Sequence, residues 1–527
     1  MNQVPPPRVL VIALSEATLD LMLPWVAEGC LPNLQRLIEN GASGRLRSQI
    51  PPITPQMWGT IVTGRSPGHH GAFDFWQRGP DGRFREIDGA DLRVPTVWSR
   101  LGERGLRCGI VNVPFTYPPQ NINGFMISGE DAPGAHPSIA SPESLYNEIV
   151  GKFGRYRLKD IFPGGRQKSD YLTLIPQDIE KQTDVMEYLL TEKQWDFAML
   201  FYSASAIAQH YFWADMESES ASNPYREVVR TAYRSLDTAI GRLVNVAGPE
   251  TCVFIISDCG AGPLQSGVQV NTFLRREGFL TYKESASTAA SRSIISRLRT
   301  RVQGGLQKWF PKSWYFSINR NLPRLKAWIQ SYLAESDIDW SRTRAFCRGK
   351  EGDLFINLKG RDPRGIVKPG EEYEAVRSAI IDRLEALVDP ATGKKAVDRV
   401  FRAEELYQGP MLGWAPDLII AWRNNAYMPT ESDRDKDSIF VNRWREYMNW
   451  PTSGGHRLEG VLVASGPGIR RGVPVAGAQI IDLMPTWLHC LGQDVPNELE
   501  GRVIVELFEQ TAPPIVRVDP WPAFNAT

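Results

Sequence analysis

Short runs of consecutive aliphatic residues, each followed by a segment with helical spacing of its apolar positions, recur along the chain. The first run, residues 8–14, is continuous in β-branched and aliphatic side chains, which is typical of a strand covered on both faces of a parallel sheet. A helix is expected to follow over about residues 18–28 and to end at Gly29. Further buried strands are expected at residues 106–112, 197–202, 252–257 and 460–465. Further helices are expected at residues 33–39, 206–216, 225–246, 373–387 and 482–491.

This alternation of strands and helices predicts an α/β fold with a doubly wound, mostly parallel central sheet. In such a sheet the carboxyl ends of the parallel strands meet at one edge. Ligands bind in the loops that leave this edge. Candidate chemistry is therefore sought in the segments that follow the predicted strands.

The alternation breaks down over residues 285–338, which we expect to be a lid inserted into a core formed by residues 1–284 and 339–527. Between residues 292 and 326 there are nine Lys or Arg residues and no Asp or Glu, with aromatic residues interleaved. Apolar residues at helical spacing predict a basic amphipathic helix here. This segment is either a cationic lid over an anionic substrate, a membrane-surface contact, or a solvated charged face whose apolar stripe packs on the core.

The overall composition is that of an ordinary globular protein. Of 527 residues, 42% are hydrophobic and 23% charged, and 60 basic residues balance 60 acidic ones. Disordered and collagen-like classes are excluded, and the missing basic excess argues against nucleic-acid binding. No apolar run reaches the roughly 18 residues of a membrane-spanning helix or forms a signal-peptide core, so we expect a cytoplasmic protein with no transmembrane segment. Six cysteines without a CxxC pair predict neither a disulfide framework nor a zinc ribbon.

Thr54 is the first candidate for chemistry. It follows a proline-rich stretch that excludes a strand and precedes Pro55, so we expect it at the N-cap of a helix. A hydroxyl placed there feels the positive end of the helix, which lowers the cost of an alkoxide and attracts an anion. Helix capping by itself also explains a threonine at this position.

Three further candidates adjoin the predicted strands. His210 follows the strand at 197–202, Asp258 follows the strand at 252–257, and His456 precedes the strand at 460–465. A histidine by itself is more often a surface or core residue than a ligand. Together with Asp258 and Thr54, however, the two histidines predict one shared site.

Seven segments occur in a characteristic order: VLVIALSEATLDL, LPNLQRLIENGASGRLRS, IPPITPQMWGTIVTGRSPGHHGAFDF, VNVPFTYPP, SDCGAGPL, PDLII and GGHRLEGVLVASGPGI. This series resembles the alkaline-phosphatase superfamily, specifically its type I phosphodiesterase and nucleotide pyrophosphatase branch, from about residue 8 to residue 508 except for the insertion. The resemblance implies an α/β/α sandwich hydrolase in which two metal ions, usually zinc, flank a Thr or Ser nucleophile. It implies that Thr54 is the nucleophile and that Asp258, His210 and His456 are metal ligands.

Half of the six ligand positions of the family do not match. Where the family has Asp, Asp and His, this chain has Ser15, Ala206 and Cys259. One metal position keeps His210 and His456 but loses its carboxylate at Ala206, which leaves two protein ligands where a catalytic zinc has three. We expect that position to be empty or weak.

The other metal position keeps Asp258. A Cys259 thiolate could bind a soft metal there together with Asp258 and Thr54, although Cys259 is better explained as a small buried apolar residue. Glu16 stands one residue beyond the missing aspartate and has a longer side chain, but successive residues leaving a strand point in opposite directions, so its reach is not assured. The expected cofactor is none or a single weakly held Zn²⁺, with Asp258, Cys259, His210 and His456 as candidate ligands.

Three functions stay open. The first is a repurposed, metal-poor enzyme in which Thr54 attacks a phosphorylated, sulfated or acyl-type substrate, His210 or His456 is the base and Asp258 orients it. The second is a non-catalytic protein that binds an anionic ligand or a partner, and the third is a weak one-metal phosphodiester hydrolase. Standard two-metal phosphodiesterase activity is not expected, because each lost stabilising group costs about 3–4 kcal/mol of barrier lowering.

The expected partner is a small anionic substrate or ligand. The candidate residues for contacting it are Ser15, Trp58 and Arg457, in addition to the catalytic group. The sequence leaves the substrate and the oligomeric state undetermined.

Overall fold

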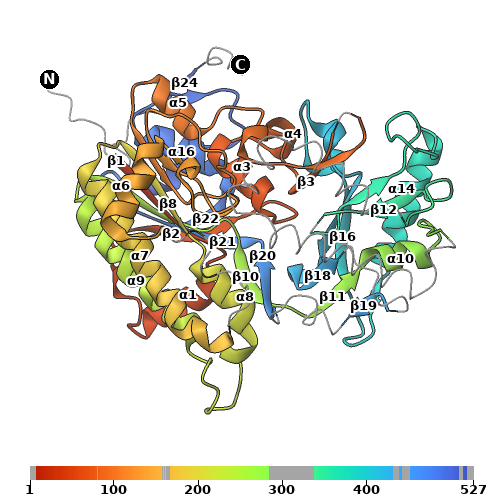
Figure 1. The fold of residues 1–527 in the computed structure, drawn as a ribbon, viewed down its shortest axis with the longest axis horizontal. Helices are drawn as coiled ribbons and strands as arrows, with labels where there is room; N and C mark the ends of the chain where they lie inside the picture. Colours follow the sequence, from red (N-terminus) through yellow and green to blue (C-terminus); the bar gives the residue numbers. More distant parts are fainter. Residues whose placement is uncertain are drawn as a thin grey trace.

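The structure, a computed structural model, describes residues 8–79, 81–156, 158, 161, 167–283, 337–349, 351–430, 438–441, 452–509 and 514–518. These residues form a large lobe around a nine-stranded sheet and a smaller lobe around a four-stranded sheet (Figure 1). The expected lid over residues 285–338 lies outside the described residues, except for its last two positions.

The large sheet is mostly parallel, as predicted. Its five central strands run parallel, β21 is antiparallel to both of its neighbours, and β7 is antiparallel to β6. The strand order across the sheet is β22 (Val473–Gln479), β2 (Gly41–Arg47), β21 (Glu459–Ser465), β9 (Thr251–Ile256), β1 (Arg8–Leu14), β8 (Phe197–Tyr202), β5 (Cys108–Val111), β6 (Gly124–Ile127), β7 (Ala140–Ser141).

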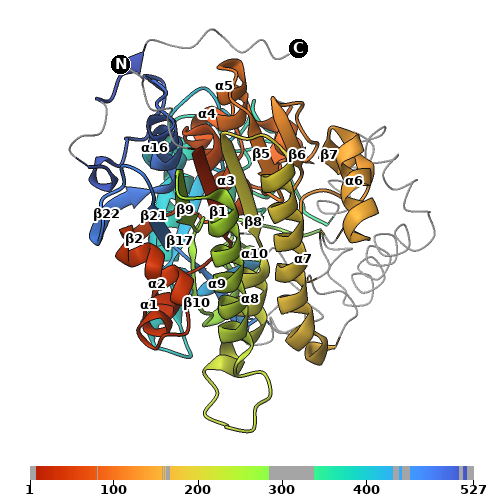
Figure 2. The same cartoon turned by 90° about the vertical axis from the view of Figure 1, so that its left-hand side faces the viewer.

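Helices cover both faces of this sheet, which explains the continuous apolar run of β1. Leu10, Ile12 and Leu14 face one apolar layer, and the alternate residues of β1 face the other, because side chains along a strand alternate. The first layer is formed with α1 (Leu19–Ala27), α2 (Pro32–Glu39), α6 (Glu143–Phe153), α7 (Tyr171–Glu192), α8 (Ala204–Met216) and α9 (Val228–Ala247), of which α7, α8 and α9 lie side by side in Figure 2. The second layer is formed with α3 (Thr54–Thr63), α5 (Val97–Glu103) and α16 (Leu483–Cys490).

The sequence predicts most of these elements within two or three residues, and the strands at 8–14 and 197–202 at their full bounds. It does not predict the strands β2, β6, β7 and β22 or the helices α5, α6 and α7, of which α7 is the longest, a 22-residue helix that packs beside α9. Pro176 lies inside α7, and a proline normally ends a helical pattern. Burial of ten side chains of α7 against the sheet layer compensates for this interruption.

The smaller lobe is built on an antiparallel sheet that consists of β12 (Ala345–Cys347), β13 (Leu354–Ile356), β17 (Leu418–Trp422) and β16 (Val397–Arg402). Its apolar core includes side chains of α10 (Val270–Arg276) and α14 (Glu371–Glu385). A hairpin of β3 (Trp76–Arg78) and β4 (Phe84–Glu86) joins this core, because Phe84 packs edge-to-face on Phe346 and Phe355.

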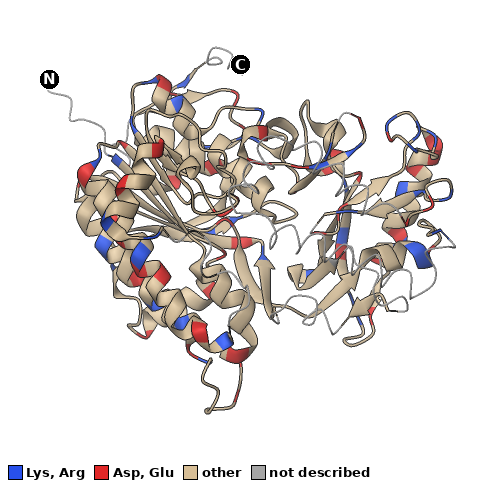
Figure 3. Cartoon of the chain, viewed as in Figure 1, with Lys and Arg blue, Asp and Glu red and all other residues tan. Residues whose placement is uncertain are grey.

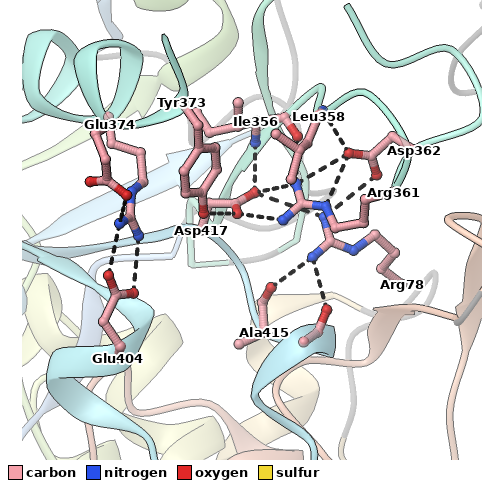
Figure 4. A network of polar contacts seen from close by, with 12 residues as sticks. Arg78, Ile356, Leu358, Arg361, Asp362, Tyr373, Glu374, Glu404, Ala415 and Asp417 are labelled. Atoms are coloured by element: carbon pink, nitrogen blue, oxygen red, sulfur yellow. Dashed lines mark hydrogen bonds and ion pairs between the residues drawn. The ribbon is translucent and has the colours of Figure 1, made fainter. Parts of the chain in front are cut away.

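Arg78 at the end of β3 anchors the hairpin in a buried polar network (Figure 4). Its guanidinium donates to Ala415 O at 3.1 Å and lies 3.5 Å from Asp362 and 3.8 Å from Asp417. Arg361 binds Asp417 with two hydrogen bonds of 2.6 and 2.8 Å. This network joins the hairpin to the smaller lobe.

Acidic and basic residues are interleaved on the outer helices of the large lobe (Figure 3), in line with their equal numbers in the chain. Arg242 of α9, for example, pairs with Asp184 and Glu187 of α7. Among the helices of the described residues, none has both the length and the apolar character that crossing a bilayer requires.

Candidate active site

The candidate residues converge at the carboxyl ends of β9, β1 and β8, three neighbouring parallel strands in the middle of the large sheet. Glu16 lies two residues beyond β1, and Asp258 lies two residues beyond β9. His210 is in α8, the helix that follows β8. His456 is in β20 (Gly454–Arg457), which pairs with β10 (Gly260–Pro263) just after β9.

Glu16 joins the two histidines into one cluster. Its Oε1 lies 2.9 Å from His210 Nε2 and 3.2 Å from His456 Nε2, and the two imidazole rings are 5.6 Å apart at their centroids. The second carboxylate oxygen, Oε2, is buried and has no hydrogen-bond partner. Within the described part of the chain, these three side chains form the one group of three or more His, Cys, Asp or Glu residues whose ligand atoms approach closely enough to hold a metal ion.

The backbone of Glu16 explains why its side chain reaches the histidines. Strand β1 ends at Leu14, and Glu16 has the left-handed φ of 57°, so the alternation of side chains along a strand no longer applies at this position. The Glu16 amide donates to Asp258 Oδ1 at 3.1 Å, and the Glu16 carbonyl accepts from Gln209 Nε2 at 3.0 Å. Buried side chains thus hold both of its backbone polar groups.

His210 is oriented by the backbone of β20. Its Nδ1 donates to Gly454 O at 2.8 Å, since a carbonyl oxygen can only accept. Strand β20 comes this close to α8 because Gly454 has no side chain, and a Cβ there would lie 2.4 Å from Gln209 O. A neutral His210 then has its lone pair on Nε2, facing the Glu16 carboxylate. In that form His210 Nε2 and Glu16 Oε1 are both acceptors and lie 2.9 Å apart, so a proton or a cation must lie between them.

Without a metal ion, the cluster is an ion pair. Burial lowers the pKa of His456, but the Glu16 carboxylate outweighs it and raises the pKa to about 10. Burial raises the pKa of Glu16, but His210 and His456 outweigh it and hold the pKa well below its usual range. A cation that binds here must therefore displace the proton of His456.

Asp258 uses both of its oxygens within the protein. Oδ1 accepts from the amides of Glu16 and Cys259, each at 3.1 Å, and Oδ2 accepts from Trp58 Nε1 at 3.0 Å. Burial raises the pKa of Asp258 to about 6. Trp58, a predicted substrate-binding residue, is fully buried and packs edge-to-face on Phe201, so it orients Asp258.

Cys259 lies in the apolar layer on one face of the large sheet and is fully buried. Burial raises the pKa of its thiol well above 9, with a further contribution from Asp258. The thiolate that a soft metal needs is therefore disfavoured. The structure brings the predicted ligands His210 and His456 together, and it places Asp258 and Cys259 outside their cluster.

Thr54 does not cap α3, contrary to the prediction. Ile53 occupies the N-cap with an extended backbone, and Thr54 is the first helical residue, with no side-chain cap hydrogen bond at this terminus. Thr54 and Trp58 are four residues apart and share one face of α3. Trp58 donates to Asp258, so the face of α3 that carries Trp58 is turned towards Asp258. Thr54 is on this same face, one helical turn closer to the start of α3.

Ser15 and Arg457, the other two predicted substrate-binding residues, both have structural contacts. Ser15 is buried, and its carbonyl accepts from Ser205 Oγ at 2.7 Å. The Arg457 guanidinium donates to the backbone oxygens of Asn425, His456 and Pro263 and so supports β20. Burial lowers the pKa of Arg457 to about 10.

The family follows from comparison with known proteins. The family profile described as "Type I phosphodiesterase / nucleotide pyrophosphatase" matches residues 9–450. The chain belongs to this family. A search of curated proteins finds no match.

Solved structures of similar fold include phosphonoacetate hydrolase from Sinorhizobium meliloti 1021 in complex with phosphonoacetate, with a TM-score of 0.56 and 15% identity. Human ectonucleotide pyrophosphatase / phosphodiesterase 5 has a TM-score of 0.50 and 11% identity. In both cases the alignment covers 93% of this chain and 96% of the other. At these identities the likeness shows the fold alone, the alkaline-phosphatase-like α/β/α sandwich that the sequence predicts.

The cation implied by this phosphodiesterase family can be tested against the residues present. Two imidazole nitrogens and a carboxylate are the donors of a common catalytic zinc site, in which neighbouring ligand atoms at about 2.0–2.1 Å from the metal are about 3.3 Å apart. The separations of Glu16 Oε1 from the two Nε2 atoms, 2.9 and 3.2 Å, are close to this value. The unpartnered Glu16 Oε2 adds a further donor. The cluster therefore fits one cation.

Two residues near the cluster were not predicted from the sequence. Glu351 lies between β12 and β13 in the smaller lobe, and its Oε1 is 3.9 Å from His456 Nδ1. Gln209 precedes His210 and binds the turn at Glu16. No local pattern marks Glu351, because only packing of the smaller lobe brings it to β20. Gln209 could have been noticed as a buried polar residue beside a candidate ligand.

Proposed function

We propose that this family member is a one-cation hydrolase of small phosphorus-containing anions, phosphodiesters or phosphonates. Glu16, His210 and His456 would hold the cation, with zinc the best fit to their donor atoms. The observation that carries the proposal is the Glu16 carboxylate, with one oxygen against both imidazoles and the other unpartnered. In this proposal the Glu16 carboxylate is the third ligand. It takes the place of the carboxylate that the family has at position 206, where this chain has Ala206.

When bound, the cation would supply positive charge to an anionic substrate and lower the pKa of an adjacent hydroxyl. Thr54 is the proposed nucleophile. It is free of a capping role. The amide N–H groups of Thr54 and Gln56, on either side of Pro55, have no partner within the helix, so this end of the helix attracts an anion. His210 and His456 serve as ligands in this proposal through Nε2. Nδ1 of His210 is held by Gly454 O, and Nδ1 of His456 lies 3.9 Å from Glu351 Oε1.

A metal-free reaction with His456 as the base receives less support. With a pKa raised to about 10, His456 carries a proton near neutral pH and has no lone pair with which to accept another. The name of the phosphonoacetate hydrolase, a protein of similar fold, supports a small phosphorus-containing anion as the substrate class.

The proposal can be tested by moving the carboxylate ligand. Protein purified without chelator should contain about one zinc per chain, and Glu16→Ala should lose it. Adding Ala206→Asp to Glu16→Ala should restore the zinc, because residues 206 and 210 are one turn apart on the same face of α8. Elemental analysis gives the metal content. Hydrolysis of bis(p-nitrophenyl) phosphate and of a p-nitrophenyl phosphonate monoester gives the activity.

Glu28→Ala is the matched control, because Glu28 also pairs with a basic side chain, Arg230, but at the surface and away from the sheet edge that carries the cluster. It should keep both zinc and activity. Wild-type protein without stoichiometric metal, or Glu16→Ala with a full complement of metal, would refute the one-cation site. Turnover that persists in excess chelator would refute a cation-dependent reaction.

A further inference from the structure

The turn after β1 holds a glutamate in a conformation that non-glycine residues rarely adopt. Glu16 has φ 57°, and such a backbone persists only where the surroundings over-determine it. The side chain of Glu16 is directed to the histidines by this conformation. Whatever holds the turn therefore also holds the carboxylate in place.

Gln209 is one of the two side chains that bind the backbone of Glu16 in this turn. It is fully buried, its Nε2 donates to Glu16 O at 3.0 Å, and its Oε1 accepts from the Tyr233 hydroxyl at 2.9 Å. The Tyr233 oxygen in turn accepts from the Thr18 amide at 3.2 Å. These bonds form a closed chain from Thr18 through Tyr233 and Gln209 back to Glu16.

Asp258 holds the other backbone polar group of Glu16, its amide N–H. Its Oδ1 accepts from the Glu16 amide, and its Oδ2 is fixed by Trp58. Asp258 is a buried carboxylate with three donors around it, so it is already satisfied. Substitution of Gln209 leaves the three hydrogen bonds of Asp258 in place. Of the two side-chain hydrogen bonds to the Glu16 backbone, it removes only the one to the carbonyl oxygen.

We propose that Gln209, supported by Tyr233, is a positioning residue that sets the cation affinity of the cluster by holding Glu16 in its left-handed conformation. The inference rests on the proposed function in one respect, namely that the cluster binds a cation. It goes further in assigning part of the affinity to a residue that contacts neither the cation nor the substrate. Residues that orient metal ligands in this way change affinity by roughly 10–100-fold when removed.

The test uses the full-length protein, freed of metal by dialysis against a chelator and titrated with Zn²⁺ in competition with a chromophoric chelator. Gln209→Met keeps a similar volume but can neither donate to Glu16 O nor accept from Tyr233. It should raise the zinc dissociation constant about 10–100-fold. Tyr233→Phe keeps Gln209 bound to Glu16 and should raise the constant less. Substitution by Co²⁺ should give a visible spectrum that differs between wild type and Gln209→Met.

Gln182→Met is the matched control. Gln182 is also buried and donates to a carboxylate, Asp178 Oδ2 at 2.8 Å, but it lies in α7 and is no part of the chain of bonds to Glu16. It should lower the melting temperature about as much as Gln209→Met while leaving the zinc dissociation constant within twofold. A purely structural role for Gln209 predicts the same result for both variants.

The outcomes separate the two proposals. If wild type binds zinc and Gln209→Met binds it equally well, the role of Gln209 is refuted and the one-cation site stands. If wild type binds no zinc, both are refuted. If Gln209→Met does not fold, Tyr233→Phe decides, and an unchanged dissociation constant in that folded variant refutes the role of the Tyr233–Gln209 pair.

Discussion

Replacing Glu16 by glutamine in the metal-free protein tests the electrostatic account of the cluster. The substitution removes the negative charge between the two histidines while keeping the length of the side chain. Glu16 and His456 are both mostly shielded from solvent, at 8% and 24% side-chain exposure. We therefore expect a large loss of stability that depends on pH.

The magnitude follows from the raised pKa of His456. A rise from 6.5 to about 10, at about 1.4 kcal/mol per unit, corresponds to at most about 5 kcal/mol of stabilisation. Because part of the His456 side chain touches solvent, we expect a loss of about 3 kcal/mol on Glu16→Gln, at the lower end of the range for breaking a buried ion pair.

The sign of the pH dependence is set by the direction of each shift. A raised pKa of His456 means that its stabilisation is complete below pH 6.5 and is lost as the pH rises through about 10. The lowered pKa of Glu16 means that its stabilisation is present above pH 4.5 and is lost in stronger acid. The difference between wild type and Glu16→Gln should thus be greatest near pH 5–6 and smallest at pH 10 and above.

Urea unfolding of the chelator-treated proteins at pH 6, 8 and 10, followed by circular dichroism, measures this difference. Glu28→Gln serves as the control, because Glu28 is half exposed in its pair with Arg230 and should cost at most about 1 kcal/mol. A loss on Glu16→Gln of less than about 1 kcal/mol, or one that is equal at all three pH values, would refute the reasoning.

Three further predictions concern single side chains. Thr54→Ala should lower kcat/KM for bis(p-nitrophenyl) phosphate at least about 100-fold without changing the melting temperature, because Thr54 makes no cap hydrogen bond, and full activity would exclude it as the nucleophile. Cys259→Ala should cost about 1–2 kcal/mol in urea unfolding but keep the zinc measured by elemental analysis, and loss of that zinc would restore Cys259 as a ligand. Arg78→Met should cost about 3–5 kcal/mol in urea unfolding, because the substitution leaves two buried carboxylates without the cation that faces them. The control is Arg85→Met in the neighbouring strand, which should cost at most about 1 kcal/mol because Arg85 is more exposed. Equal losses in the two variants would contradict this account.

Part of the site could be predicted from the sequence because it depends on local signals. The aliphatic run at 8–14 predicts a central strand, and polar residues after such strands predict a site at the carboxyl edge of the sheet. His210 and His456 do meet there. The resemblance to the family adds that Ala206 stands where a carboxylate ligand is expected, and it therefore predicts a site with a missing ligand.

The position of Glu16 could not be predicted in this way. Its reach depends on a left-handed φ at one residue, and that φ is stabilised by Asp258 and Gln209, which are 242 and 193 positions away in the chain. The same holds for Glu351, which reaches His456 only through the packing of the smaller lobe. Sequence spacing carries no information on such contacts.

The sequence by itself thus determined the sandwich, the edge of the sheet where chemistry gathers and two of the three cluster residues, because periodicity and the ends of strands are properties of the local chain. The tertiary structure alone decided which carboxylate stands between the histidines and which residues stay protonated. Those properties depend on burial and on the approach of distant segments, and each of these exists only once the chain has folded.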